Sequence, residues 1–385
     1  MKKIVTIGEL GIIITGNTPP RSNPKLYGNY TPFIKATDIS ETEKYTYHPE
    51  EYYSEEGYNK YIKSLIPKGS TCVVTIGSIG KKMTMAHCDL FINQAMNAII
   101  PNENFDNEYV YYAVKNILPN IRMLDSGTAS GRENVSKSAF SKMQILIEDN
   151  IITQRRIAEI LSRYDSLIEN YQKQIKLLEE SAQRLYKEWF VDLRFPGHEN
   201  TKIVDGVPEG WEKKCLGDFC LIFTGKKNAN SNIKNGKYKF FTCGDKPLSI
   251  NSYIYDGAAI IISGNGSYTG RTTFFKGKFD LYQRTYACTI KSGFNNNYIY
   301  GLYEFVNSEL TSQISGGTHG AAIPYIVMSD LTGFTFLYNE YVLLKFSSII
   351  KKNLLETIKI IDRIQLLTEA RDRLLPKLMS GEIEV

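Results

Sequence analysis

One stretch in the middle of the chain, residues 151–189, reads IITQRRIAEILSRYDSLIENYQKQIKLLEESAQRLYKEW and contains neither proline nor glycine. Its apolar residues recur at alternating steps of four and three, and polar or charged residues fill most positions between them. This spacing is typical of the seam of a coiled coil. The seam positions are Ile157, Leu161, Tyr164, Ile168, Tyr171, Ile175, Leu178, Ala182, Leu185 and Trp189. As a single helix the stretch would form a rod of roughly 55–60 Å, too long for an ordinary globular helix.

The composition is that of a water-soluble protein with more than one domain. The 385 residues are 42% hydrophobic and 23% charged, which predicts two or three domains, each with its own core. No apolar run is long enough to cross a bilayer. Glycines interrupt the apolar N-terminal stretch, which therefore reads as a strand and not as a signal peptide, so we expect a cytoplasmic protein. The net charge of +5 permits a polyanionic partner without requiring one.

The six cysteines form no C-x-x-C pair, so we expect buried, reduced thiols. His87-Cys88 is the only adjacent pair of histidine and cysteine, no second pair stands at ligand spacing, and we predict no metal site. The glycine-rich segments 77–81 and 264–270 lack the spacing of nucleotide-binding loops.

Six short phrases of the first half recur in the same order in the second half. For example, residues 15–17 (TGN) are answered by 224–226 (TGK), and 91–95 (FINQA) by 281–284 (LYQR). In each copy a segment rich in short β-like runs, with one short helix near 108–116 or 298–309, precedes a long helix. Asp149 or Asn150 can cap the first long helix, and Asn339 can cap the second. The second is expected over residues 340–375, with Pro376 ending it.

These features predict an α+β fold in which two β-rich domains are separated by an antiparallel two-helix coiled coil, with an internal pseudo-twofold repeat. The predicted parts are a first domain, a central helix, a linker, a second domain and a C-terminal helix, at residues 1–148, 149–190, 191–208, 209–338 and 339–380. An alternative is that each helix packs only on its own domain. The seam of the second helix is less regular, with Asn353, Thr357 and Arg371 near it, which suggests that part of it faces a partner subunit.

Several phrases resemble the specificity subunit of Type I restriction-modification systems, and the resemblance extends over essentially the whole chain. They are GSTCVVTIGSIGK at 69–81, INQ at 92–94, TQRRIAEIL at 153–161 and LLPKLMSGEI at 374–383. The sequence departs from the family pattern at Ser70, where an aspartate is usual. It departs again where Gln283-Arg284 stands in place of Asn93-Gln94.

The resemblance implies target-recognition domains that each read one half of a bipartite double-stranded DNA sequence. It implies a coiled coil that sets their spacing and docks modification (methyltransferase) subunits, with restriction subunits joining the complex and no membrane partner. No catalytic residues and no cofactor are expected on this chain, because S-adenosylmethionine, Mg and ATP would be held by partner subunits. The alternatives are a stand-alone DNA methyltransferase and a purely structural coiled-coil tether.

DNA recognition needs Lys and Arg for phosphates, and polar side chains for base edges. Several of the candidates lie in or beside glycine- or asparagine-rich loops, and the alternative is that these are solvated loop tips. In the first domain they are Arg21, Lys35, Thr37, Lys81, Lys82 and Arg132. In the second domain they are Lys226, Lys227, Asn228, Asn265, Tyr268, Arg271, Arg284 and His319.

Overall fold

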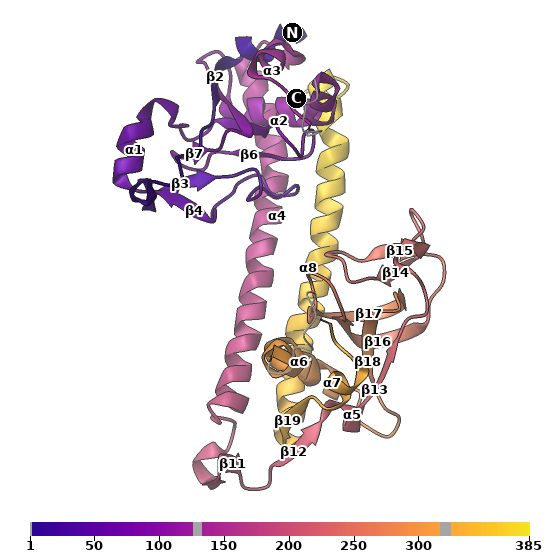
Figure 1. Ribbon diagram of the computed structural model, residues 1–385. Helices are drawn as coiled ribbons and strands as arrows, with labels where there is room; N and C mark the ends of the chain where they lie inside the picture. The colour runs from indigo at the N-terminus through magenta and orange to yellow at the C-terminus, as the bar shows by residue number, and fades with distance from the viewer. Residues whose placement is uncertain (1, 126–132, 316–324) are drawn as a thin grey trace. The chain divides into compact units, whose positions relative to one another are not determined.

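A computed structural model describes residues 2–125, 133–315 and 325–385. The chain divides into two compact units. Unit 1 comprises Met1–Gln172 with Asp362–Val385, and unit 2 comprises Lys173–Ile361. The division falls inside two long helices, α4 (Ile151–Tyr186) and α8 (Glu340–Ser380), each of which is continuous (Figure 1). Each unit is therefore built from one β-rich domain, one half of α4 and one half of α8.

Unit 1 contains three small sheets. The first has the order β2-β8-β5-β6, the second β4-β3-β7, and the third pairs β1 with β9. The strands are β1 (Lys2–Thr6), β2 (Gly11–Thr15), β3 (Tyr27–Ile34), β4 (Glu51–Tyr53), β5 (Thr71–Val74), β6 (Met83–Met85), β7 (Phe91–Ile92), β8 (Met96–Pro101) and β9 (Gln144–Glu148). The helices before α4 are α1 (Glu55–Tyr61), α2 (Asn107–Ile117) and α3 (Lys137–Lys142).

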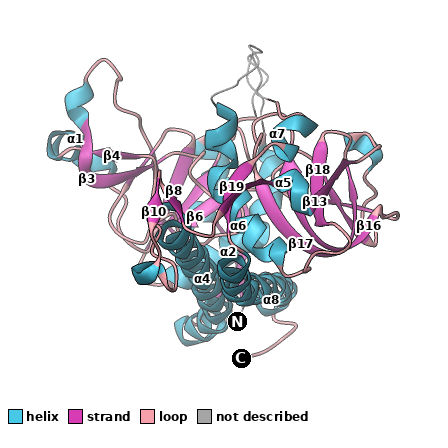
Figure 2. Ribbon diagram, turned by 90° about the horizontal axis from the view of Figure 1, so that it is seen from below, coloured by secondary structure: helices cyan, strands magenta, loops and turns pink. Residues whose placement is uncertain are grey.

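Unit 2 has one six-stranded sheet in the order β13-β18-β16-β17-β14-β15, and a separate pair β12-β19. The strands are β12 (Glu212–Cys215), β13 (Cys220–Thr224), β14 (Tyr238–Phe241), β15 (Leu248–Ile250), β16 (Tyr255–Ser263), β17 (Thr272–Leu281), β18 (Thr285–Ile290) and β19 (Thr335–Tyr338). The helices before α8 are α5 (Leu216–Phe219), α6 (Tyr298–Ser315) and α7 (Met328–Thr332), and Figure 2 shows the sheet beside α5 and α7. A two-stranded hairpin of β10 (Ile203–Val204) and β11 (Val207–Pro208) precedes the domain.

The two units share one connectivity, which confirms the predicted repeat. In each, the strand before the long helix pairs antiparallel with the first strand of the domain, β9 with β1 and β19 with β12. An asparagine then caps the long helix. The Asn150 side chain accepts hydrogen bonds from the amides of Ile152 and Thr153, and the Asn339 side chain accepts one from Val342. These caps satisfy amides that the first helical turn leaves unpaired.

The predicted antiparallel pairing of the long helices is present in each unit. In unit 1, Ile157 and Leu161 of α4 share a core with Leu375 and Leu378 of α8. The Arg363 guanidinium lies 5.8 Å from the Tyr171 ring, so the residue numbers of α8 fall as those of α4 rise. In unit 2 the core includes Ala182, Tyr186 and Trp189 of α4 with Phe346 and Ile350 of α8. Every seam position proposed above is at least partly buried.

Two expectations for the second long helix are wrong. Pro376 does not end α8, which continues to Ser380. Proline removes one helical hydrogen bond, and the buried side chains of Leu378 and Met379 hold the last turn against unit 1. Arg371 does not face outward for a partner subunit, because its side chain is 4% exposed and pairs with Asp165. A charged residue at a seam position can be buried when an opposite charge meets it.

The segment 191–208 is held against the core of unit 2. Phe195 is buried, and its ring centroid lies 4.6 Å from that of Trp211.

All six cysteines are free thiols, but only Cys72, Cys220 and Cys288 are fully buried. Among the described residues, no helix is long and apolar enough to span a membrane.

Candidate nucleic-acid interface

In unit 1, four turns gather at one end of the sheets. The Asn17 amide donates to the Ile92 carbonyl, and the Asn93 amide donates to the Ile34 carbonyl, both at 3.0 Å. The Thr75 amide donates to the Ala95 carbonyl at 2.8 Å. The turns that follow β2, β3, β5 and β7 are therefore tied to one another by backbone hydrogen bonds.

We call this set of turns and the backbone hydrogen bonds between them the frame. The same frame recurs in unit 2. The Tyr282 amide donates to the Phe241 carbonyl, and the Gly264 amide donates to the Arg284 carbonyl, both at 2.9 Å. These bonds match those of Asn93 and Thr75 in unit 1. The Gln283 amide also donates to the Lys227 carbonyl at 3.0 Å, which joins the loop after β13 to the group.

A glycine makes the closest approach in each frame. A Cβ on Gly16 would lie 2.2 Å from the Ile92 carbonyl oxygen, and a Cβ on Gly225 would lie 1.8 Å from the Leu281 carbonyl oxygen. Both contacts are with backbone, which cannot swing aside. The recurrent Thr-Gly phrase therefore marks the point where the chain leaving β2 or β13 passes the end of β7 or β17.

The six candidates of unit 1 differ in availability. Lys81 and Thr37 are exposed. Arg21 pairs with Glu51 at 2.8 Å, and Lys35 pairs with Glu50 at 2.5 Å and with Glu51 at 3.1 Å. The hydrogen bond from Arg21 holds the pKa of the Glu51 carboxyl below its usual value. Arg21 is exposed and could exchange Glu51 for a phosphate, because such surface pairs contribute little net free energy.

The candidates of unit 2 divide in the same way. Lys226, Asn228 and Arg284 are exposed. Lys227 forms an internal ion pair, because its ammonium lies 3.0 Å from the buried Asp280 carboxylate. Asn265 forms an isolated β-bridge with Tyr325 and is half-buried.

Lys82 and Arg271 occupy equivalent positions, and both side chains donate hydrogen bonds to backbone carbonyls of a second turn. The Val74 amide bonds to the Lys82 carbonyl, as the Ser263 amide bonds to the Arg271 carbonyl. The Lys82 ammonium donates to the Ala36 carbonyl at 3.4 Å. The Arg271 guanidinium donates to the Gly244 and Asp245 carbonyls at 2.7–2.8 Å and lies 4.2 Å from the Tyr268 ring centre. Both cations tie the turn after β5 or β16 to the turn after β3 or β14.

Sequence reasoning did not include Gln94 among the candidates and did not recognise it as the counterpart of Gln283. The backbone bonds above place Asn93 opposite Tyr282, and hence Gln94 opposite Gln283 and Ala95 opposite Arg284. The apparent replacement of Asn93-Gln94 by Gln283-Arg284 is therefore wrong by one position. Both glutamines are exposed at the tip of the same turn, and the shared letter Q in the two phrases was the signal. The Gln94 side chain accepts a hydrogen bond from the Thr18 hydroxyl.

Arg132 and His319 lie outside the described residues. The chain just beyond them rejoins the frame in both units. The Val135 amide donates to the Thr75 carbonyl, and the Ile326 amide donates to the Gly264 carbonyl, each at 2.8 Å.

Each frame presents exposed cations and amides on turns fixed by a sheet. Lysine and arginine suit phosphates, and glutamine can hydrogen-bond the edge of adenine. Among the described residues, no group of three His, Cys, Asp or Glu side chains could hold a metal ion. The geometry is that of a binding surface.

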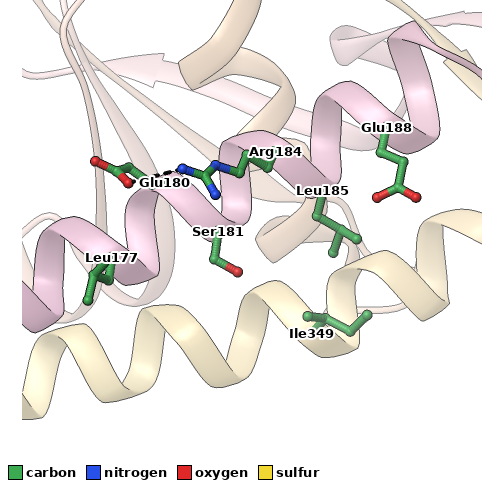
Figure 3. Close-up of a pocket in the computed structure, with 7 residues that line it drawn as sticks. All are labelled: Leu177, Glu180, Ser181, Arg184, Leu185, Glu188 and Ile349. Atoms are coloured by element: carbon green, nitrogen blue, oxygen red, sulfur yellow. Dashed lines mark ion pairs between the residues drawn. The ribbon is translucent and has the colours of Figure 1, made fainter.

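A second surface lies along the helices of unit 2. Leu177, Ser181 and Leu185 of α4 face Ile349 of α8 across an open groove of ≈ 380 Å³ (Figure 3). Glu180 and Arg184, 3.5 Å apart, and Glu188 complete its lining. Leu177 is 64% exposed, which leaves an apolar side chain beside charged ones.

Comparison with known proteins agrees with this geometry. A family model described as the Type I restriction modification DNA specificity domain matches residues 2–180 and 208–336. The Type I restriction enzyme MjaIX specificity subunit of Methanocaldococcus jannaschii is 28% identical, over 100% of this chain and 93% of that protein. The EcoDI specificity subunit of Escherichia coli is 35% identical over 129 residues, which are 33% of this chain and 27% of that protein.

Among solved structures, the S subunit of a Type I restriction-modification system from M. genitalium superposes with a TM-score of 0.62. The match covers 98% of this chain and 96% of that chain at 16% sequence identity, and so supports the fold. The family match spans both domains and most of α4. The chain belongs to the Type I restriction modification DNA specificity domain family.

Proposed function

We propose that this chain is the DNA-recognition subunit of a Type I restriction-modification complex, and that each unit reads one half of a bipartite target. The observation that carries the proposal is the duplicated frame, which holds different side chains at equivalent places. Lys35 and Thr37 stand where unit 2 has Thr242 and Gly244, and Ala95 stands where it has Arg284. One backbone with two sets of side chains suits the reading of two different half-sites.

The two long helices set the distance between the half-sites in this proposal. A helix rises ~1.5 Å per residue, so α4 and α8 are long enough to span more than one turn of B-DNA, which is ~34–36 Å. The groove in unit 2 is a candidate docking place for the methyltransferase subunits, because the apolar side chains of Leu177 and Ile349 are exposed in it.

The chain binds and positions but does not catalyse in this proposal. S-adenosylmethionine, Mg and ATP belong to the methyltransferase and restriction subunits, and methyl transfer requires those subunits. Assay of the purified chain alone for methyl transfer to DNA separates this function from that of a stand-alone methyltransferase. Activity without partners would refute the proposal.

The test of half-site reading uses Gln94 and Gln283. Cells that express this chain with its methyltransferase subunits are compared by methylome sequencing with cells that express Gln94→Ala or Gln283→Ala. Loss of one good base contact costs ~1–3 kcal/mol of discrimination. We expect Gln94→Ala to relax one half of the methylated motif, and Gln283→Ala to relax the other.

Gln144→Ala is the matched control, because Gln144 is an exposed glutamine on β9, outside the frame. It should leave the motif unchanged. A change in both halves from a single substitution would contradict the division of reading between the units.

A further inference from the structure

The core between the long helices contains one buried ion pair in unit 1. The Arg371 guanidinium donates to the Asp165 carboxylate at 2.5 Å, and the Tyr112 hydroxyl donates to its other oxygen at 2.5 Å. The Asp165 and Arg371 side chains are 8% and 4% exposed. The three residues come from α4, α8 and α2, so this cluster joins both long helices to the first β-rich domain.

The repeat identifies the counterparts of these residues in unit 2. Aligned on their caps Asn150 and Asn339, the helices match in burial. Positions 157, 161, 182, 186 and 189 of α4 correspond to 346, 350, 371, 375 and 378 of α8, and all ten are buried. On this alignment Asp165 corresponds to Leu354, and Arg371 corresponds to Ala182.

Unit 2 is apolar where unit 1 carries the ion pair. Ala182 is buried in the core of unit 2, and Leu354 packs against that core. Tyr112 corresponds to Gly301, where an added Cβ would lie 2.5 Å from the Ser347 hydroxyl oxygen. Unit 2 therefore has neither the charges nor the space for this cluster.

We infer that the Asp165–Arg371 pair selects the partner of each long helix, so that α4 pairs with α8 and not with α4 of a second copy of this chain. The repeat gives both helices the same pattern of core positions, so like helices could otherwise pair between copies. An antiparallel pair of two α4 helices would set Asp165 against Ala182 of the other copy. A pair of two α8 helices would set Arg371 against Leu354.

Like pairing therefore separates Asp165 from Arg371. Arg371 keeps only its contact with the half-exposed Asp372 at 2.8 Å, and the buried Asp165 carboxylate loses its hydrogen-bonded cation, which is strongly unfavourable. The pairing of α4 with α8 buries Asp165 and Arg371 together. A single polar contact in an apolar seam is a known way to fix the register and partner of a coiled coil. The selection depends on the difference between the two units, and not on charge as such.

The experiment makes the two units alike in two opposite ways. In the full-length chain, Asp165→Leu with Arg371→Ala gives unit 1 the residues of unit 2. Ala182→Arg with Leu354→Asp gives unit 2 the ion pair of unit 1. Copies with two different affinity tags are mixed, unfolded in guanidinium chloride, refolded by dilution, and recovered on one tag. The second tag in the recovered fraction measures pairing between copies.

Both variants should raise the recovered second tag about tenfold or more above the unmodified chain, because neither then penalises like pairing. Exchange of α4 and α8 between copies keeps the original ion pair, so it is equally open to the unmodified chain and sets the baseline. Circular dichroism at 222 nm establishes which variants fold, and one folded variant is enough for the test. A folded variant of either kind that stays at the baseline overturns the inference.

The matched control is Glu159→Leu with Arg163→Ala. It applies the same changes to an ion pair of α4 whose side chains are 62% and 72% exposed. It should stay at the baseline. An increase equal to that of the test variants would attribute the association to surface stickiness and would also overturn the inference.

Discussion

The two units share one connectivity, but a strand that is whole in unit 2 is broken in unit 1. In unit 2, β17 is ten residues long, pairs with β16 from Thr272 to Phe279, and pairs parallel with β14 at its end. In unit 1, two short strands take the place of β17: β6 pairs antiparallel with β5, and β7 pairs parallel with β3. Residues 86–90 separate β6 from β7. The backbone bonds of the turns beyond are nevertheless the same. The frame that holds the candidate DNA contacts is thus independent of how continuous the sheet behind it is.

The helix cores differ more sharply, and the largest predicted effect tests that difference. Arg371→Ala removes the hydrogen-bonded cation from the buried Asp165 carboxylate, which should lower the free energy of unfolding by about 3–5 kcal/mol. Urea denaturation followed by circular dichroism measures it. Arg373→Ala is the control, because that side chain is 83% exposed and makes only a 3.9 Å contact with Glu369. Equal effects of the two substitutions would contradict the importance of the buried pair.

The second prediction tests whether the frame is equally tight in both units. Gly16→Ala and Gly225→Ala should each cost about 3 kcal/mol or more, because the added Cβ meets a backbone carbonyl oxygen. Gly244→Ala is the control, because among the described residues an added Cβ would meet a threonine hydroxyl oxygen at 3.2 Å and no backbone atom within 4 Å. Thermal unfolding measures all three. A harmless alanine at either test position would show that this frame can relax.

Burial shifts the titration of counterpart residues on α2 and α6 in opposite senses. Burial lowers the pKa of Lys115 to about 8 and raises the pKa of Glu304 to about 7. Glu304 accepts a hydrogen bond from Ser308 and interacts with Tyr186, Tyr303 and Glu179, of which Glu179 adds repulsion between carboxylates. Between pH ~4.5 and ~7 the folded protein therefore binds a proton on Glu304 that the unfolded chain has released. The contribution of this protonation to the free energy of unfolding is complete below pH ~4.5 and is lost as the pH rises to ~7.

The third prediction follows from this sign. Glu304→Gln removes the cost of a buried carboxylate, so it should raise the free energy of unfolding at pH 8 by roughly 2–3 kcal/mol, and by little at pH 4.5. Lys115→Met should also stabilise at pH 7, by a smaller amount because the lysine is half-buried, with the gain fading between pH 8 and 10.5. Urea titrations at a series of pH values test both. A gain from Glu304→Gln that does not depend on pH would contradict this account.

The smallest predicted effect is on DNA affinity, and it tests the exposed lysines that form no internal ion pair among the described residues. Lys81→Ala and Lys226→Ala should each weaken binding to duplex DNA about three- to tenfold and reduce the slope of log affinity against log salt by ~1. Filter binding across a range of NaCl concentrations measures both quantities. Lys142→Ala, an exposed lysine on α3, should change neither. An unchanged slope for Lys81→Ala would remove that residue from the interface.

Much of the fold could be predicted from local patterns, because those patterns reflect local physics. The four-three spacing predicted α4, since a helix brings such positions onto one face. The caps Asn150 and Asn339 were predictable because capping needs only a side chain next to free amides. Pro376 misled the prediction, since a proline this near a helix end costs less than the burial of Leu378 and Met379 gains.

The state of each candidate cation depends on residues far away in the chain. Lys227 forms an ion pair with Asp280, and Arg271 donates hydrogen bonds to the turn at 244–245. Neither partner is recognisable from the sequence near the cation. Gln94 was overlooked because its equivalence to Gln283 depends on a one-residue register, which the backbone bonds of the frame fix.

The sequence by itself determined the two copies, the long helices and their seam, because periodicity and repetition are properties of the order of residues. Only the tertiary structure decided the fate of Arg371. In the sequence it is an irregularity in a seam, and in the fold it is one half of a buried pair. The reason is that burying a charge is favourable or costly according to its partner, and the partner, Asp165, is brought to it by the antiparallel packing of α4 and α8.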